Sequence, residues 1–258
     1  HCVLNEKHIS GVEISSTADV PSGTGLGSSS AFTVGLLHTL SCYKGKYISK
    51  GKLAEEACKV EIEKLGAPIG KQDQYAVAHG GLNFIKFHKD DTVSVEPIIV
   101  KGETINRLQE NLVMFYTGLT HDANKILAEQ KRNITQAEKT KNLLRMCQLA
   151  GAMKSSLEQN ELGDFGAILN ESWMKKRELA GSISTPRIDE LYQCAIENGA
   201  SGGKLLGAGG GGFLLFYCPK EKQDLLREKL RLRPFPFKFE HDGTSVVYIG
   251  DKYWEDYR

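Results

Sequence analysis

The stretch PSGTGLGSSSA, residues 21–31, carries the strongest structural signal in the chain. Its glycines alternate at positions 23, 25 and 27, and three serines follow where a helical pattern begins. Upstream, Gly11–Asp19 predicts a short strand that leads into this loop, and downstream Phe32–Leu40 carries apolar residues at helical spacing. The predicted local order is strand, glycine loop, helix.

This loop has the composition of an anion site. Glycines let backbone N–H groups turn toward an anion without obstruction by a Cβ atom, and a helix N-terminus adds unsatisfied donors and a positive dipole. A Walker loop would need Lys directly before the Ser, where Gly27 stands, and the dinucleotide fingerprint would need Gly at position 28, which is Ser28. The phosphates of a nucleotide fit the pattern, and so does an ordinary tight turn with serine N-caps.

Length and composition limit the class of protein. With 258 residues and 40% hydrophobic content, the chain can bury a core in one large domain or two modest ones. Its 33 basic and 32 acidic residues give a net charge of +1, so no global field favours nucleic acid or an anionic membrane. No apolar run approaches membrane-spanning length, the start HCVLNEKHIS lacks a secretory pattern, and the six cysteines show no CxxC pair. We expect a cytoplasmic protein without nucleic-acid or membrane partners, and the sequence gives no oligomeric state.

The remaining chain has helices and antiparallel-type strands without regular βα alternation, which predicts an α+β fold. A boundary near residue 105 would give domains 1–105 and 106–258. Expected elements are a helix capped by Ser49 and running to about Leu65, a hairpin of LNFIKF and TVSVEPIIV, a strand at 111–117, helices between 122 and 199, strands in GKLLG and GGFLLFY, a charged helix at 220–231 and a strand in PFKFEHD.

Two further stretches carry a family resemblance: EIEKLGAPIGKQDQY, residues 61–75, and KLLGAGGGGF, residues 204–213. With them, the chain resembles the GHMP kinases, which include galactokinase, homoserine kinase, mevalonate kinase and phosphomevalonate kinase. PSGTGLGSSSA looks like the family's second signature and KLLGAGGGGF like its third. The resemblance implies a two-domain fold with a ribosomal protein S5 domain 2-like N-terminal domain, which binds ATP, and a ferredoxin-like C-terminal domain.

Within that family, three segments are most similar to the D-glycero-D-manno-heptose 7-phosphate kinase branch and more distantly similar to L-fucose kinase. These segments are GKQDQYAVAHGGLNFIKF, FYTGLTHDANKILAEQKRNI and GKLLGAGGGGFLLFYC. The resemblance implies transfer of phosphate from ATP to the anomeric hydroxyl of that heptose phosphate, giving the 1,7-bisphosphate. The alternatives are a kinase for an unphosphorylated sugar such as fucose or galactose, or a nucleotide-binding module without turnover. The family's first signature is missing, because the sequence starts at His1 shortly before the second signature.

The resemblance assigns ATP and Mg²⁺ as cofactors. It implies that Ser29 provides a hydroxyl to Mg²⁺ and that a glutamate on the following helix provides a carboxylate, for which we choose Glu63 with Glu61 as the alternative. A solvated helix face would also explain either glutamate. The residues expected to hold ATP are Pro21, Ser22, Gly23, Thr24, Gly25, Leu26, Gly27, Ser28, Ser29 and Ser30.

The catalytic candidates follow from the same resemblance. Asp73 matches the aspartate that accepts the proton of the attacking hydroxyl or orients it, although a helix N-cap would also explain it. Lys71 is expected to steady the phosphates or Asp73, with a surface lysine as the alternative.

On the substrate side, Lys204 is a candidate contact for the sugar phosphate. A close-packed turn beside nucleotide or substrate, or otherwise a flexible hairpin loop, is expected at Gly207, Gly209, Gly210 and Gly211. Trp173 and Phe213 fit apolar core patterns, and no histidines show metal-ligand spacing.

Overall fold

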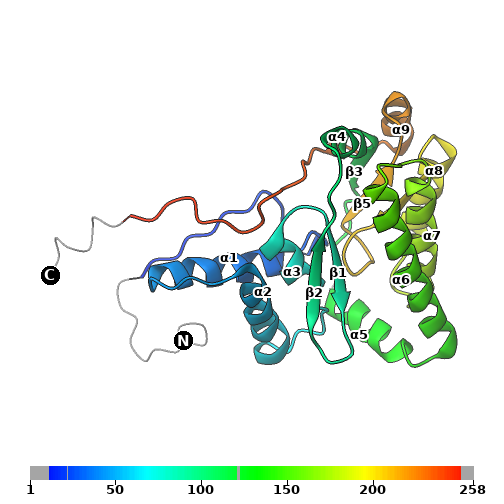
Figure 1. The fold of residues 1–258 in the computed structure, drawn as a ribbon. Coiled ribbons are helices and arrows are strands. Elements are labelled where there is room, and N and C mark those ends of the chain that lie inside the picture. Colours follow the sequence, from blue (N-terminus) through cyan, green and yellow to red (C-terminus); the bar gives the residue numbers. More distant parts are fainter. Residues whose placement is uncertain (1–11, 22, 121–122, 251–258) are drawn as a thin grey trace. The chain divides into compact units, whose positions relative to one another are not determined.

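The computed structural model describes residues 12–21, 23–120 and 123–250 (Figure 1). It divides into two compact units. The first is built around Ser29–Gly81, with the described parts of His1–Asp19 and Glu240–Arg258; the second comprises Leu82–Phe239 and the loop segment Val20–Ser28, as far as described. The two units interleave along the sequence, and the domain boundary expected near residue 105 stays a prediction.

Helices dominate the first unit. Helix α1 (Ser28–Tyr43) is followed by α2 (Lys50–Cys58), which continues directly as the π-helix η1 (Lys59–Lys64), and by α3 (Gln72–His79). The predicted cap is confirmed, because the Ser49 hydroxyl accepts the hydrogen bond of the Lys52 backbone N–H.

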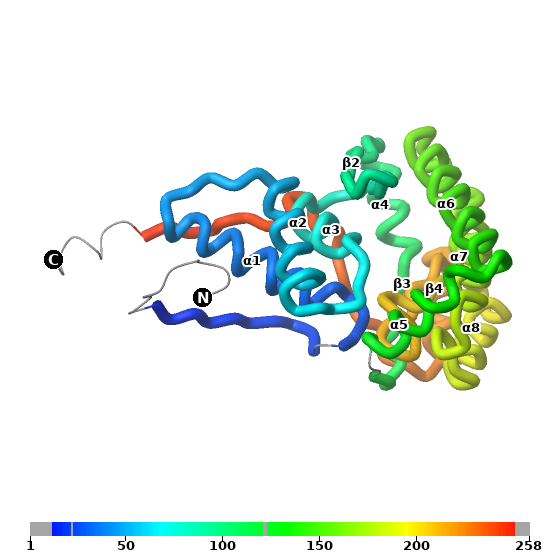
Figure 2. Tube along the Cα trace, turned by 90° about the horizontal axis from the view of Figure 1, so that it is seen from below, coloured from blue at the N-terminus to red at the C-terminus, as the bar shows by residue number. Residues whose placement is uncertain are grey.

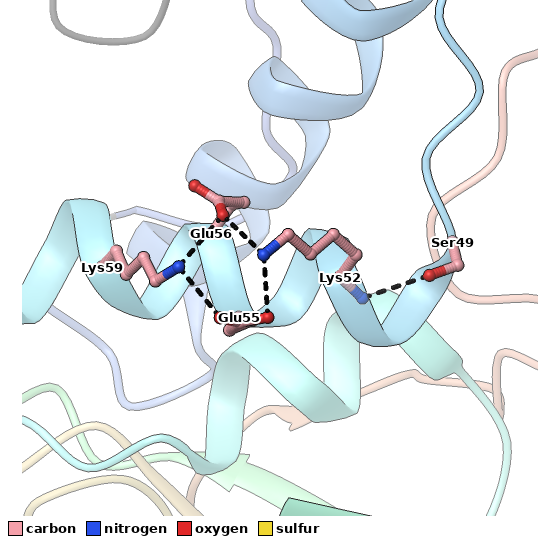
Figure 3. A network of polar contacts seen from close by, with 5 residues as sticks. All are labelled: Ser49, Lys52, Glu55, Glu56 and Lys59. Atoms are coloured by element: carbon pink, nitrogen blue, oxygen red, sulfur yellow. Dashed lines mark hydrogen bonds and ion pairs between the residues drawn. The ribbon is translucent and has the colours of Figure 1, made fainter. Parts of the chain in front are cut away.

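One face of α2 is charged and the other is buried. On the charged face, Lys52 and Lys59 each contact both Glu55 and Glu56 at 2.9–3.2 Å (Figure 3). These side chains are 38–51% exposed, and ion pairs of this kind contribute only a few tenths of a kcal/mol each. Because Leu53 on the opposite face is 1% exposed, burial of the apolar face is the larger contribution to holding the helix in place.

Two expected strands differ from the structure. Residues 12–18 form no strand, and in the described part of the chain no neighbouring strand hydrogen-bonds to them. A strand requires a partner for its backbone N–H and C=O groups, so alternation of side chains alone does not produce one. PFKFEHD, residues 236–242, contains no strand residue either, because the short strand β6 (Pro234–Phe235) ends directly before it.

The second unit contains the strands of both sheets. The predicted hairpin is confirmed as β1 (Asn83–Phe87) paired antiparallel with β2 (Val93–Pro97). After α4 (Gly102–Asn111), strand β3 (Leu112–Tyr116) joins a four-stranded antiparallel sheet of order β4-β5-β3-β6. Strands β4 (Gly202–Leu205) and β5 (Phe213–Tyr217) flank the glycine run, as predicted.

The remaining helices belong to this second unit: α5 (Ala123–Asn133), α6 (Ala137–Glu158), α7 (Phe165–Arg177), α8 (Pro186–Glu197), the short 3₁₀ helix η2 (Lys220–Lys222) and α9 (Gln223–Leu230). Helices α6 and α7 run side by side in both views (Figures 1 and 2).

Helix α7 packs closely against β4 where two glycines meet. A Cβ atom on Gly202 would lie 1.8 Å from the carbonyl oxygen of Gly166. Trp173 is 1% exposed and packs in the core cluster that also contains Leu214 and Phe216 of β5, and Phe213 is 2% exposed, so both are buried core residues as predicted. This packing fixes α7 and the strand that precedes the glycine run. Across the residues that the structure describes, no helix combines the length and apolar character needed to cross a membrane.

Candidate active site

The glycine loop owes its shape to left-handed backbone conformations. Gly23, Gly25 and Gly27 have φ of 76°, 80° and 70°. Residues with a Cβ atom rarely adopt these values, which explains why glycine occurs at every second position. Between them, Thr24 is 1% exposed and its hydroxyl donates to the Pro21 carbonyl at 3.0 Å.

The backbone N–H groups of this loop are available as donors. Within the described residues, no N–H between Gly23 and Ser28 donates a hydrogen bond to another protein group. Ser28 also opens helix α1, so its N–H group is one of the first helical donors, which have no partner within the helix. The described part of the expected ATP loop therefore has the donor supply of an anion site. Ser22 lies outside the described residues.

The two glycine motifs are in direct backbone contact within the second unit. A Cβ atom on Gly25 would lie 2.7 Å from the Leu206 carbonyl oxygen, and one on Gly207 would lie 2.4 Å from the Gly25 Cα. Likewise, a Cβ atom on Gly212 would lie 2.2 Å from the Thr24 carbonyl oxygen. Real Cβ contacts are not this short, so these positions accept only glycine without rearrangement.

Hydrogen bonds hold the turn between β4 and β5 in place. The Gly212 N–H donates to the Leu119 carbonyl, the Thr117 hydroxyl donates to the Gly212 carbonyl, and the Gly210 N–H donates to the Ile183 carbonyl, each at 2.8 Å. The glycine run is therefore a fixed, close-packed turn, as expected, and not a flexible hairpin loop. Gly209, Gly210 and Gly211 are buried, whereas Gly207 is exposed.

Two lysines lie close to this turn along the chain or in space. Lys204 is half-buried on β4, three positions before Gly207. Lys176 of α7 donates from its Nζ to the Gly207 carbonyl, a contact that the sequence analysis did not single out. Since Lys176 stands in the basic run of Lys175, Lys176 and Arg177, nothing in the sequence distinguishes it from its neighbours.

In the first unit, Glu61 forms the centre of a polar cluster. Its Oε1 accepts from the Ser29 hydroxyl at 2.5 Å, and its Oε2 accepts from the Ser30 hydroxyl at 2.8 Å and from Gln74 Nε2 at 2.6 Å. The residue is 2% exposed, which rules out a solvated helix face as the explanation for it. Three donors around one buried carboxylate indicate a built site.

The glutamate next to Ser29 is thus Glu61, the alternative, and not Glu63, our first choice. Glu63 is exposed and makes no hydrogen bond with Ser29. Both residues lie in η1, and a step of two residues along a helix turns a side chain to the opposite side. Only one of the two glutamates can therefore face α1.

The pair of Ser29 and Glu61 fits a hydrated divalent cation. Mg²⁺ takes hard oxygen ligands at about 2.0–2.1 Å in octahedral geometry, so neighbouring ligands are roughly 3 Å apart. The Ser29 Oγ and Glu61 Oε1 atoms are 2.5 Å apart and need to separate only slightly to meet that spacing. The described chain has no group of three or more His, Cys, Asp or Glu that could hold a metal ion, so nucleotide phosphate and water would complete the shell.

Asp73 lies in the first turn of α3 and is exposed. The N-cap position is occupied by Lys71, whose side chain makes no capping hydrogen bond, and Asp73 lies two positions further on, so an N-cap position does not account for Asp73. The next residue, Gln74, is 0% exposed and reaches Glu61. Consecutive residues of α3 thus present a carboxylate at the surface and an amide in the buried cluster.

Lys71 is half-buried and lies near Cys58 of α2. Burial raises the pKa of the Cys58 thiol to about 11, and the positive charge of Lys71 acts in the opposite direction. The thiol is therefore protonated at neutral pH and is no nucleophile. The structure places Lys71 at the start of α3, directly before Gln72 and Asp73.

Comparison with known proteins decides the family. Residues 1–81 match the model for the GHMP kinases N terminal domain, and residues 153–235 match the model for GHMP kinases C terminal. A D-glycero-alpha-D-manno-heptose 7-phosphate kinase from Campylobacter jejuni is 33% identical over 231 residues, which cover 88% of this chain and 68% of that protein. The chain belongs to the GHMP kinase family. The α+β fold and the sugar-kinase class expected from the sequence are confirmed at the level of this GHMP family.

Two further sugar kinases are similar to this chain. A bifunctional fucokinase/GDP-fucose pyrophosphorylase from Arabidopsis thaliana is 28% identical over 85% of this chain and 21% of that protein. A solved D-glycero-D-manno-heptose 1-phosphate kinase from Bacteroides thetaiotaomicron has a TM-score of 0.66 and 27% identity, over 90% of this chain and 66% of that one. This GHMP kinase chain thus spans about two thirds of the length of the two heptose kinases.

Proposed function

We propose that this GHMP kinase transfers the terminal phosphoryl group of ATP to the anomeric hydroxyl of D-glycero-D-manno-heptose 7-phosphate, giving the 1,7-bisphosphate. The observation that carries the proposal is the backbone contact between Gly25 and Gly207, which joins the two glycine signatures into one structure. The Campylobacter heptose kinase, 33% identical, supports the choice of acceptor. A cytoplasmic location is part of this proposal.

The loop from Gly23 to Ser28 would hold the phosphates of ATP. Its N–H groups face no protein acceptor among the described residues, and they are followed by the N-terminus of α1. Phosphoryl transfer depends mainly on alignment and on neutralisation of charge on the phosphate oxygens. Backbone donors provide both without the conformational freedom of long side chains.

Ser29 and Glu61 would hold Mg²⁺. The cation, when bound with ATP, supplies positive charge that neutralises the phosphate oxygens. The short contact between the Ser29 hydroxyl and the buried Glu61 carboxylate keeps two hard oxygen ligands together before any cation arrives. This assignment replaces Glu63 by Glu61 in the proposed site.

Asp73 would accept the proton of the attacking hydroxyl or orient that hydroxyl. Its exposed position in the first turn of α3 leaves the carboxylate accessible to a substrate. A proton acceptor must be an ionised carboxylate, and an acidic side chain is favourable in the first turn of a helix, where the dipole is positive. Lys71 would steady the phosphates or Asp73. Lys204 and the turn at Gly207, Gly209, Gly210 and Gly211 would lie on the substrate side.

A substrate panel tests the proposal. The chain is incubated with ATP and Mg²⁺ plus one acceptor at a time, and ADP release is followed together with phosphate on the product. We expect transfer to the heptose 7-phosphate. The relative named as a fucokinase favours an unphosphorylated sugar as the second candidate acceptor, and transfer only to fucose or galactose would overturn the heptose assignment. ATP binding with no transfer to any sugar would favour a binding module.

A further inference from the structure

Gln74 has a role in this site that the family resemblance does not assign. It is 0% exposed in the first turn of α3, directly after Asp73. Its Nε2 donates to Glu61 Oε2 at 2.6 Å. Because an ionised carboxylate can only accept hydrogen bonds, the amide nitrogen must be the atom that faces it.

The other end of the Gln74 amide has an unused acceptor. Its Oε1 atom is buried and has no hydrogen-bond partner among the described residues. Buried polar atoms are satisfied in the large majority of cases, and an unsatisfied one costs about 1–3 kcal/mol. Next to a carboxylate cluster, this acceptor can take a hydrogen bond from a donor that arrives with a ligand.

The two carboxylate oxygens of Glu61 have different hydrogen-bond donors. Gln74 and Ser30 both donate to Oε2, whereas among the described residues only the Ser29 hydroxyl donates to Oε1. Ser30 and Gln74 are buried, and Ser29 is exposed. Oε2 is therefore the oxygen held by buried donors. Oε1 lies on the more accessible side, where it could bind a cation.

We propose that Gln74 is a positioning residue of the cation site: its Nε2 holds Glu61 in place, and its Oε1 accepts a hydrogen bond from water bound to the cation. This inference rests on the proposed function. Mg²⁺ gives up its water reluctantly and keeps several molecules when bound to protein, so a water donor comes with the ion. Groups that orient metal ligands change metal affinity or activity by about 10–100-fold when removed.

A direct measurement of cation binding tests this role. Mn²⁺ replaces Mg²⁺ and is titrated into the chain with saturating ATP, and free Mn²⁺ is followed by electron paramagnetic resonance. In Gln74→Met, the new side chain has a similar length but lacks the amide donor and the amide acceptor. We expect its Mn²⁺ affinity to fall at least tenfold, with metal-free ATP binding unchanged, since the loop from Gly23 to Ser28 is untouched.

The chain offers a matched control. Gln223 is 6% exposed, and its Nε2 donates to the carbonyls of Glu110 at 2.7 Å and Cys218 at 3.1 Å. Gln223→Met therefore also removes a buried amide, but one without a neighbouring carboxylate cluster. We expect it to lower the urea midpoint while leaving Mn²⁺ affinity as in the wild type.

The measurements distinguish failure of the Gln74 role from failure of the proposed kinase function. If Gln74→Met is folded and its Mn²⁺ affinity stays within about twofold of wild type, against the 10–100-fold expected for such a group, the positioning role is wrong. Should that variant not fold, Gln74→Asn provides the same test with a shortened amide, and we expect an intermediate loss of affinity. If the wild type binds no Mn²⁺ in the presence of ATP, the proposed function itself fails, and the role of Gln74 fails with it.

Discussion

Gly25 and Gly207 meet backbone to backbone, so closely that a Cβ atom on Gly207 would lie 2.4 Å from the Gly25 Cα. The two residues belong to signatures far apart in the sequence, yet each limits the other to glycine. The backbone of the candidate phosphate loop is thus packed directly against a second glycine turn. A loop held in this way keeps its N–H groups in one arrangement, which is what binding of phosphates requires.

Gly207→Ala should disrupt this contact. The residue has φ of 69°, which costs an L-residue about 1–2 kcal/mol, and the new methyl group would also collide with Gly25. We expect a loss of at least ~2 kcal/mol in the free energy of unfolding and at least ~10-fold weaker ATP binding. Urea unfolding and calorimetric titration with ATP measure the two effects.

Gly35→Ala is the matched control for that variant. Gly35 lies within α1, and nothing stands within 4 Å of a Cβ atom placed on it. Alanine in a helix interior is favoured over glycine by up to ~1 kcal/mol, so this variant should be slightly more stable and bind ATP normally. Equal stability losses in both variants would argue against a special contact at Gly207.

Much of this site could be predicted from the sequence, because glycine patterns report backbone geometry directly. The alternation at Gly23, Gly25 and Gly27 predicts positive φ values, and the structure has them. The turn at Gly207 was likewise expected to be close-packed. Apolar periodicity was equally informative for the hairpin and for the strands on either side of the glycine run.

The choice between Glu61 and Glu63 could not be made in the same way. Both glutamates lie in a segment with helical character, and spacing alone does not tell which side of it faces α1. The segment is a π-helix, whose changed hydrogen-bond pattern rotates side chains relative to an α-helix. Whether a segment pairs with another strand, as the segment Gly11–Asp19 was expected to do, is a tertiary property that the local pattern does not contain.

Exchanging each of the two carboxylates tests their assignment. Glu61→Gln keeps the shape but removes the charge from the buried cluster, so the Mg²⁺ concentration needed for half-maximal transfer should rise ~10–100-fold. Glu63→Gln changes an exposed residue and should leave that concentration unaltered. Steady-state rates at fixed ATP and varied Mg²⁺ give the comparison. The reverse pattern would restore Glu63 as the ligand.

The stability of the second unit should depend on pH through Glu96. Its carboxylate on β2 contacts Lys154 of α6 at 2.7 Å and Lys86 of β1 at 2.6 Å. Hydrogen bonds from Lys154 first, and then from Lys86, lower the pKa of Glu96 from 4.5 to about 2. Because the folded pKa lies below the unfolded value, this contribution is complete above pH 4.5 and is lost as pH falls toward 2.

Urea unfolding of wild type and Glu96→Gln at several pH values measures that contribution. We expect the difference in midpoint to be largest above pH 4.5 and to shrink toward pH 2. The Glu96 side chain is 39% exposed, so the effect should be small and should weaken further at about 0.5 M salt, where screening is strong. A midpoint difference that is the same at all pH values would mean that the ion pairs do not cause it.

Asp73→Asn separates binding from chemistry. The amide keeps the size of the side chain but cannot take a proton from an attacking hydroxyl, so kcat should fall by about 10²–10⁴. ATP affinity should stay nearly unchanged, because the candidate phosphate donors are backbone groups between Gly23 and Ser28. Loss of a negative charge in the first turn of α3 should cost only about 0.3–1 kcal/mol of stability. Single-turnover transfer and ATP titration on the same samples distinguish these effects, and turnover at the wild-type rate would remove Asp73 from the mechanism, since a proton acceptor in transfer cannot be replaced by an amide without loss of rate.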